Sequence, residues 1–199
     1  MLSVVKEYYD RRAPEYDDWW LGTGVFAAGE RPGWHEEVAE LIDALTALAP
    51  ARTLDVACGT AFLGRHLPGE VTGLDASAAM LAIARERIPG GRVVQGDALE
   101  LPFGDGALER VATGHFYGHL EAGDRVRFLA EARRVAPQLL VVDSARRDDV
   151  PAERMDRRVL DDGSRHEVFK RWFEPGELVE ELGGGSVIHA GRWFVAVLA

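Results

Sequence analysis

Three aspartates share one sequence setting, because each lies within or after a short apolar run. Asp55 lies in Thr-Leu-Asp-Val-Ala, Asp75 ends Val-Thr-Gly-Leu-Asp, and Asp97 follows Val-Val-Gln-Gly. The first run continues through a turn of small residues into a helix start, over residues 53–67. A strand, a tight turn and a helix, with an acid at the end of the next strand, is how an α/β sheet binds a nucleoside. The sequence therefore predicts a nucleoside ligand.

The turn leaves two kinds of nucleoside open. Gly59-x-Ala61-x-x-Gly64 loosely fits the dinucleotide fingerprint, so an NAD-dependent oxidoreductase is one alternative. Against it, Asp55 at the loop entrance would repel a pyrophosphate. The later acid Asp97, followed by Ala-Leu-Glu-Leu-Pro-Phe, is not part of the dinucleotide pattern. A ligand with ammonium and sulfonium charges would instead be attracted to Asp55.

The elements that must hold these residues alternate along the chain. Short apolar segments rich in β-branched residues predict buried strands at 53–57, 70–74, 92–95, 108–113 and 138–143. Helical patterns occupy 35–48, 77–88, 124–135 and 175–182, with Ser77 as a natural N-cap. Alternation of this kind indicates a parallel sheet with right-handed crossovers. The last two strands, 186–189 and 192–198, are parted by two residues, which predicts an antiparallel hairpin.

Composition limits the partners. The chain has 199 residues, 47% of them hydrophobic, enough for one α/β domain over 1–199. One cysteine, no membrane-length apolar run and no signal-peptide core lead us to expect a cytoplasmic protein without a membrane partner. A net charge of −10 argues against nucleic acid as a partner. The sequence leaves monomer and homodimer open.

Four motifs in order resemble those of class I S-adenosylmethionine-dependent methyltransferases. They are Leu-Asp-Val-Ala-Cys-Gly-Thr-Ala from 54, Gly-Leu-Asp-Ala-Ser-x-x-Met from 73, Gly-Asp-Ala-Leu-x-Leu-Pro-Phe from 96 and the final hairpin. The resemblance covers the whole chain and is strongest to the small-molecule branch that includes ubiquinone and menaquinone methyltransferases. It implies a Rossmann-like three-layer sandwich, with a seven-stranded mixed sheet whose last strand is antiparallel. A domain that binds the nucleoside without catalysis is a further alternative.

The resemblance also implies site residues. Asp75 would accept the two ribose hydroxyls, Asp97 would accept the adenine amino group, and Asp55 would organise the amino end of S-adenosylmethionine. The turn made of Ala57, Cys58, Gly59 and Thr60 would approach the methionine part, which Tyr16 would cover. Ala76, Met80, Ala98, Leu99, Gly114 and His115 complete the expected cofactor contacts, with S-adenosylhomocysteine as the product.

The turn departs from the family pattern at two positions. Family members usually carry glycine where Ala57 and Ala61 stand. Because the methyl group of alanine disfavours positive φ, we expect ordinary φ at both positions. This expectation concerns the shape of the loop and leaves the predicted cofactor unchanged.

A second group of polar residues follows the fourth predicted strand. His115, Tyr117 and His119 stand just past 108–113, and residues there face the ligand crevice of an open α/β sheet. A histidine with a pKa near 6.5 could deprotonate a hydroxyl or amine, so we hypothesise that His115 or His119 is a general base. Alternatively, one of them binds the cofactor carboxylate or caps the next helix. Tyr117 is the third catalytic candidate.

Two segments lie outside the predicted core. Residues 1–34 carry Tyr8, Tyr9, Tyr16, Trp19 and Trp20 and are expected to fold over the ligand edge as a lid. Residues 144–173 are interpreted as an irregular insertion before the last helix. Its arginines alternate with acids, which favours a solvated surface and leaves an anionic acceptor open.

Asp148-Asp149 is a lone acidic pair, so no metal is expected. Aromatics lining the pocket would favour a flat, apolar small-molecule acceptor.

Overall fold

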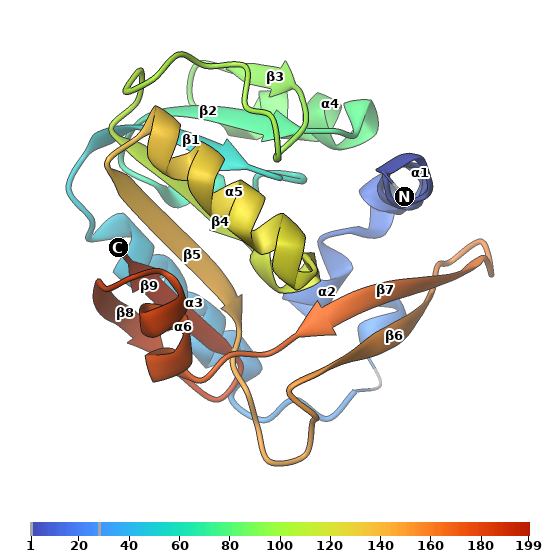
Figure 1. The fold of residues 1–199 in the computed structure, drawn as a ribbon. Helices are drawn as coiled ribbons and strands as arrows, with labels where there is room; N and C mark the ends of the chain where they lie inside the picture. Colours follow the sequence, from blue (N-terminus) through green and yellow to red (C-terminus); the bar gives the residue numbers. More distant parts are fainter. Residues whose placement is uncertain (1, 28) are drawn as a thin grey trace.

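The centre of the molecule is a seven-stranded sheet (Figure 1). The computed structural model describes residues 2–27 and 29–199. The spatial order of the strands is β3-β2-β1-β4-β5-β9-β8. Their bounds are Ala51–Val56 (β1), Gly69–Asp75 (β2), Val93–Gln95 (β3), Arg110–Gly114 (β4), Gln138–Ser144 (β5), Ser186–Ala190 (β8) and Phe194–Leu198 (β9). Neighbours from β3 to β5 pair in parallel, and β9 runs antiparallel to both β5 and β8. The predicted mixed sheet is confirmed.

Helices cover both faces of this sheet. They are α3 (Trp34–Thr46), α4 (Ala78–Arg87), α5 (Ala122–Val135) and α6 (Pro175–Glu181). Side chains of α5 and α6 share one buried cluster, and those of α3 and α4 share the other. In Figure 1, α5 and α6 lie in front of the sheet and α3 lies behind it. The predicted α/β three-layer sandwich is confirmed, and within the described residues no helix has the length and apolarity that a membrane span needs.

The burial of the middle strands follows from this layering. Along β4 and β5, Val111 and Val141 contribute to the cluster under α5, while Ala112 and Leu140 contribute to the cluster under α3. Both faces of these strands are apolar because both faces are covered. The first turn of α4 is capped as predicted, since Ser77 Oγ accepts the backbone N–H of Met80 at 3.2 Å. Every parallel strand from β3 to β5 therefore ends at the same edge, which is where an open α/β sheet binds its ligand.

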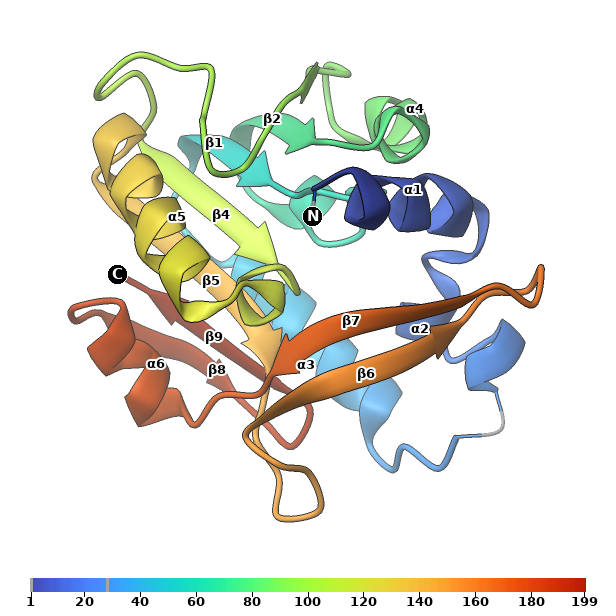
Figure 2. The same ribbon diagram turned by 45° about the vertical axis from the view of Figure 1, so that its right-hand side comes forward.

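The N-terminal segment lies beyond that edge. It comprises α1 (Leu2–Arg12), η1 (Ala13–Glu15), α2 (Asp18–Leu21) and η2 (Gly24–Phe26). Figure 2 shows α1 in front of the carboxyl ends of β1 and β2. Trp20 anchors the segment, because its ring is buried and stacks on Phe62 with ring centroids 4.8 Å apart. The described part of the segment thus packs at this edge of the sheet, and its role as a lid stays a prediction.

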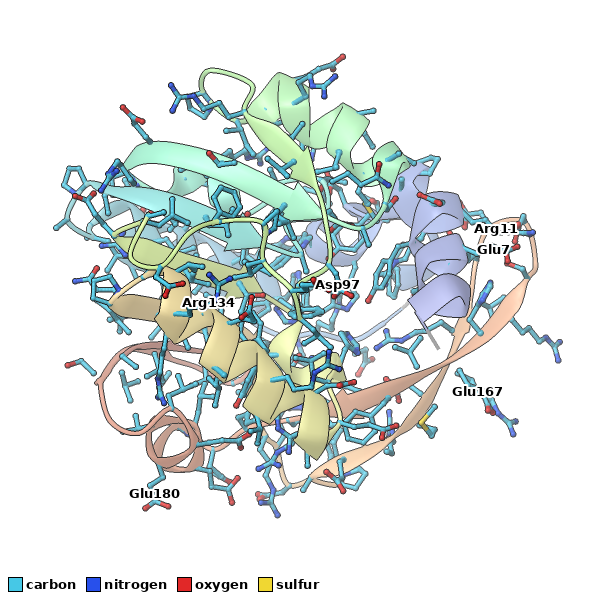
Figure 3. All side chains as sticks on the ribbon, turned by 45° about the horizontal axis from the view of Figure 1, so that its top comes forward. Glu7, Arg11, Asp97, Arg134, Glu167 and Glu180 are labelled. Atoms are coloured by element: carbon cyan, nitrogen blue, oxygen red, sulfur yellow. The ribbon has the colours of Figure 1, made fainter. Side chains whose placement is uncertain are left out.

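The stretch before α6 is regular, contrary to our expectation. Glu153–Val159 (β6) and Arg165–Arg171 (β7) form a two-stranded antiparallel ribbon that extends past the ends of the sheet strands (Figures 1 and 2). Its outer residues are exposed and charged; Glu167, for example, points away from β7 in Figure 3. An alternation of apolar and polar residues, which is the usual sequence signal of a strand, is therefore missing here.

Two contacts attach the ribbon to the sheet. Lys170 Nζ donates a hydrogen bond to Asp143 Oδ1 at the end of β5, and both side chains are buried. The carbonyl of Phe169 accepts a hydrogen bond from His119 Nδ1 at 2.6 Å. The ribbon is thereby fixed against the same edge that α1 covers.

Candidate active site

The turn after β1 adopts an unusual backbone conformation. Ala57, Gly59 and Ala61 all have positive φ, at 54°, 53° and 58°. The expectation of ordinary φ at the two alanines was wrong. A left-handed alanine costs roughly 1–2 kcal/mol, and such strain is typical of functional sites. Here it aims the backbone N–H of Gly59 at the carboxylate of Asp75, with the nitrogen 2.9 Å from Oδ2.

Asp75 ends β2 beside that turn. Its Oδ1 accepts the backbone N–H of Ser77 at 2.8 Å, and its Oδ2 accepts that of Gly59. Burial raises the pKa of Asp75, although the backbone donors oppose the shift. Each carboxylate oxygen can accept more than one hydrogen bond, so Asp75 can take two further donors from a ligand. Ala76 next to it is exposed and adds no bulk.

Asp55 is the buried acid of the turn. Only 5% of its surface is exposed, and burial together with Asp75 raises its pKa to about 7. Among the residues that the structure describes, no donor lies within hydrogen-bond distance of its carboxylate. A buried carboxylate without a partner is costly, and a cationic ligand group would relieve that cost. It is a poor neighbour for a pyrophosphate.

Other predicted cofactor contacts are already engaged in the fold. Cys58 lies against β2, where a Cβ at Gly73 would come within 2.8 Å of its Sγ. Thr60 Oγ1 donates to Asp17 of the N-terminal segment at 2.6 Å. Met80 is fully buried at the start of α4. These three residues shape and hold the turn and the helix behind it.

The loop after β3 carries the third acid, which Figure 3 labels. Asp97 Oδ1 accepts the backbone N–H of Leu99 at 2.8 Å and is half-buried. Leu99 is buried in the cluster under α5, and Ala98 packs against the same cluster. The loop therefore presents the carboxylate of Asp97 with an apolar floor beside it.

Tyr16 covers the turn from the N-terminal side. A Cβ built on Gly59 would lie 3.2 Å from the Tyr16 ring, so only a glycine leaves the ring this place. The segment is held there by Asp17, whose Oδ2 accepts a hydrogen bond from Arg87 of α4 at 2.6 Å. The predicted closeness of Tyr16 to the turn is present in the structure.

A cavity of about 190 Å³ opens next to this cover. Its walls come from the N-terminal segment, the ends of β4 and β5, and the ribbon. Trp19, Trp34, Trp172 and Trp193 supply flat apolar surface, and His115 and His119 are the titratable groups from the sheet end. Sequence reasoning missed Trp34 and Trp193, which lie far apart in the chain and meet only in the fold.

His115 has a free nitrogen in this cavity. Its φ is 54°, at the end of β4 where Gly114 gives way to the turn. Nδ1 lies 3.3 Å from Ser144 Oγ, while Nε2 is buried with no partner among the described residues. Burial, with help from Lys170, holds the pKa of His115 well below 6.5. The ring is therefore neutral at neutral pH.

His119 is oriented differently. Its Nδ1 donates to the carbonyl of Phe169, so the neutral ring carries its lone pair on Nε2. Burial, again with Lys170, holds the pKa of His119 well below 6.5. A neutral imidazole with a fixed tautomer can accept a proton at Nε2.

Tyr117, the third catalytic candidate, lies elsewhere. It sits in η4 (Tyr117–His119), is fully buried against Phe128 and Phe173, and donates its hydroxyl to Glu181 at 2.9 Å. It does not line the cavity. The prediction for Tyr117 was wrong because the turn after β4 rotates this side chain into the core under α5.

Comparisons with known proteins agree with this geometry. Residues 53–138 match a family described as a methyltransferase domain. The demethylmenaquinone methyltransferase of Thermotoga maritima is 36% identical over 132 residues, which cover 64% of this chain and 54% of the relative. That of Lactiplantibacillus plantarum is 31% identical, with 67% and 58% covered. Over residues 53–138 the chain is therefore similar to methyltransferase domains.

Solved structures similar to this chain include two of DhpI. The DhpI-SAM-HEP complex superimposes with a TM-score of 0.75 at 24% identity, covering 100% of this chain and 97% of DhpI. The DhpI-SAH complex gives a TM-score of 0.68 at 27% identity, covering 96% and 92%. The chain spans about half the length of the curated relatives it matches. The comparisons give no support to the dinucleotide alternative.

S-adenosylmethionine, the cofactor of class I methyltransferases, fits the residues of the turn. Its ammonium and sulfonium groups are cations, and Asp55 is a buried carboxylate that lacks a partner. Its ribose has two hydroxyl donors, and Asp75 has acceptor capacity left on both oxygens. The turn and the end of β2 thus offer acceptors for the ammonium and the ribose hydroxyls of this cofactor.

Proposed function

We propose that this protein transfers a methyl group from S-adenosylmethionine to an O, N or C atom of a small-molecule acceptor. The unpaired, buried carboxylate of Asp55, beside a turn folded onto Asp75, is the observation that carries the proposal. Bound there, the cofactor would supply a methyl group already activated by its sulfonium. The negative net charge of −10 and the lone cysteine support a cytoplasmic protein with a small molecule, rather than nucleic acid, as its partner.

Residues at the ends of three strands would each bind a different part of the cofactor. Asp55 would hold the ammonium and Asp75 the ribose hydroxyls. Asp97 would accept the adenine amino group, with Ala98 and Leu99 beneath the ring. Ala57, Gly59 and Tyr16 would enclose the methionine part, because Tyr16 already lies against the turn.

The acceptor would occupy the cavity beside Tyr16. Positioning of two reactants can supply much of the rate, so the chemistry does not demand a base. Where the acceptor must lose a proton, His119 is the better placed histidine, because its tautomer leaves Nε2 free to accept one. We do not assign the relatives' quinone-type acceptor to this chain. The family match ends at residue 138, before the ribbon that lines the cavity.

Calorimetric titration tests the cofactor. We expect micromolar binding of S-adenosylmethionine and S-adenosylhomocysteine, no binding of NAD, and loss of adenosyl-ligand binding in Asp75→Ala. Asp124→Ala, at a half-buried aspartate in the first turn of α5, is the matched control and should bind as the parent protein does. Absence of binding to both adenosyl ligands would refute the proposal. Binding of NAD alone would favour the oxidoreductase.

A further inference from the structure

The cavity beside the cofactor residues has an uneven charge. Its described lining includes four arginines and one lysine but only one carboxylate, Asp156. The surrounding protein is acidic, with a net charge of −10, so this local excess is not a property of the whole surface. Positive charge enclosed by aromatic walls interacts strongly with an anion because little water screens it.

Three of the five cations are neutralised by the protein itself. Arg147 pairs with Asp149 at 2.9 Å and Arg158 pairs with Asp156 at 2.9 Å. Lys170 pairs with the buried Asp143. The remaining two, Arg12 and Arg31, have no carboxylate within 4.0 Å among the described residues. Arg12 donates to the hydroxyl of Tyr8 and lies over the Tyr16 ring, on the cofactor side of the cavity.

Arg31 lies on the other side, away from the turn. Its guanidinium stacks 3.9 Å from the centroid of the Trp34 ring, and Nη1 donates to the carbonyl of Trp19 at 2.8 Å. Its Nη2 is buried and has no partner in the described structure. Gly22 leaves room for it, since a Cβ there would lie 3.3 Å from Nη2. A fixed, buried donor without an acceptor is costly unless a ligand completes it.

His115 offers a second incomplete donor in the same cavity. Its side chain is only 8% exposed, and Nε2 has no partner among the described residues. When Ser144 Oγ–H donates to Nδ1, the proton of the neutral ring resides on Nε2. The cavity lining therefore includes a guanidinium N–H and, in this tautomer, an imidazole N–H for which the described residues provide no acceptor.

We propose that the methyl acceptor is a small, flat organic anion whose carboxylate or phosphate-type group is bound by Arg31 and His115 Nε2–H. This inference rests on the proposed function, and it assigns the acceptor class that the function leaves open. The tryptophans would contact the apolar part of the acceptor. His115 would then bind the anion, and His119 would be the histidine able to accept a proton.

The test is direct binding, with S-adenosylhomocysteine titrated in the same series. Benzoate, phenyl phosphate and neutral benzamide are the probes, measured at one ionic strength by calorimetry. We expect benzoate or phenyl phosphate to bind at least tenfold more tightly than benzamide, and the stronger of the two identifies the acidic group. Raising the ionic strength should weaken the binding of the anion and leave the binding of benzamide unchanged.

Arg31→Met should weaken the binding of the preferred anion at least tenfold. The affinities for S-adenosylhomocysteine and benzamide should stay unchanged. Arg31→Lys keeps the positive charge but not the planar guanidinium that can donate two hydrogen bonds to one anion, so it should lose less anion affinity than Arg31→Met. Arg157→Met is the matched control, since Arg157 neighbours Arg158 on β6 but is 87% exposed and does not line the cavity. Circular dichroism and thermal unfolding establish that each variant is folded.

Four results would overturn the inference. Benzamide could bind as tightly as both anions, or neither anion could bind. Arg31→Met could leave anion binding intact. Arg31→Met could instead weaken S-adenosylhomocysteine, which would make Arg31 the partner of the cofactor carboxylate. Failure of the parent protein to bind S-adenosylhomocysteine would count against the proposed function, whereas normal binding of it without anion selectivity would count against this inference alone.

Discussion

The carboxylate of Asp55 occupies the space that a side chain at Gly64 would need. A Cβ built on Gly64 would lie 2.1 Å from Asp55 Oδ2. The glycine at 64 is therefore explained by close packing of the chain after the turn against the acid of β1, a role that the third glycine of the dinucleotide fingerprint also has. The acid itself separates the two nucleoside alternatives, because a buried carboxylate repels a pyrophosphate and attracts a cationic ligand group.

Asp55→Asn should make the unliganded protein less sensitive to rising pH. The folded-state pKa of Asp55 is raised to about 7, above its unfolded value, so protonated Asp55 stabilises the fold at low pH. That stability is lost as pH rises through about 7. Between about pH 4 and pH 8 the parent protein should lose on the order of 2–4 kcal/mol relative to the variant.

Urea unfolding of both proteins across this pH range measures the difference. Asp75 also has a raised pKa and contributes to the shift of Asp55, so the difference between the two proteins reports Asp55 together with its coupling to Asp75. A parent-minus-variant difference that does not change with pH would show that Asp55 is already ionised in the unliganded fold.

Ala57→Gly and Ala61→Gly should each stabilise the protein slightly. Glycine relieves a left-handed strain of roughly 1–2 kcal/mol but adds unfolded-state entropy worth about 0.4–1 kcal/mol, so a net gain of about 0.5–1 kcal/mol is expected. Ala47→Gly, where φ is −76°, is the control and should only lose stability. Equal losses at all three positions in thermal unfolding would contradict the backbone geometry of the turn.

The outcome at these alanines shows where sequence reasoning stops. The strand and turn around Asp55 and the Ser77 cap follow from local patterns and were predictable, whereas the helix expected after the turn is only the 3₁₀ turn η3 (Gly64–His66). The φ of Ala57 was not, because propensity favours ordinary φ and the hydrogen bond from Gly59 to Asp75 overrides it. A hydrogen bond between residues 16 positions apart leaves no pattern in the local sequence from which it could be predicted.

The acceptor side was less predictable for the same reason. The residues of β6 read as Glu-Arg-Met-Asp-Arg-Arg-Val, with no apolar face to mark a strand. Arg31 and Trp193 meet in one cavity only after the chain has folded. Tyr117 was misplaced because its position just after β4 predicts exposure to the ligand, whereas η4 turns its ring into the core.

Lys170→Met should detach the ribbon from the sheet. It leaves Asp143 buried without its cation, and breaking a buried ion pair typically costs about 3–5 kcal/mol. Asp143 keeps the backbone donors of Gly118 and Ser144, so the loss should lie near the lower end of that range. Urea unfolding of Lys170→Met, Asp143→Asn and the double variant measures the coupling.

The double variant should be more stable than the sum of the single losses implies, because neither charge is left alone. Arg157→Met on the exposed face of the ribbon is the control and should change stability by less than about 0.5 kcal/mol. Strict additivity of the two substitutions would mean that Lys170 and Asp143 do not stabilise one another.

His119→Ala should lower kcat about 10²- to 10⁴-fold with any acceptor that has to lose a proton, while binding of S-adenosylhomocysteine stays unchanged. Since the pKa of His119 is held well below 6.5, the parent rate should be flat through neutral pH and fall only under acid conditions. Steady-state rates across pH measure both effects. If His119→Ala and His115→Ala both retain turnover with such an acceptor, no histidine of the cavity is the base.

The most direct test of the central claim is a crystal structure of this protein with S-adenosylhomocysteine. The account predicts the ammonium of the ligand at the Asp55 carboxylate, the ribose hydroxyls on Asp75 and the adenine beside Asp97 and Leu99, with the Gly59 turn unchanged. A ligand bound away from these three aspartates, or adenine and ribose placed with no contact to Asp75, would contradict it.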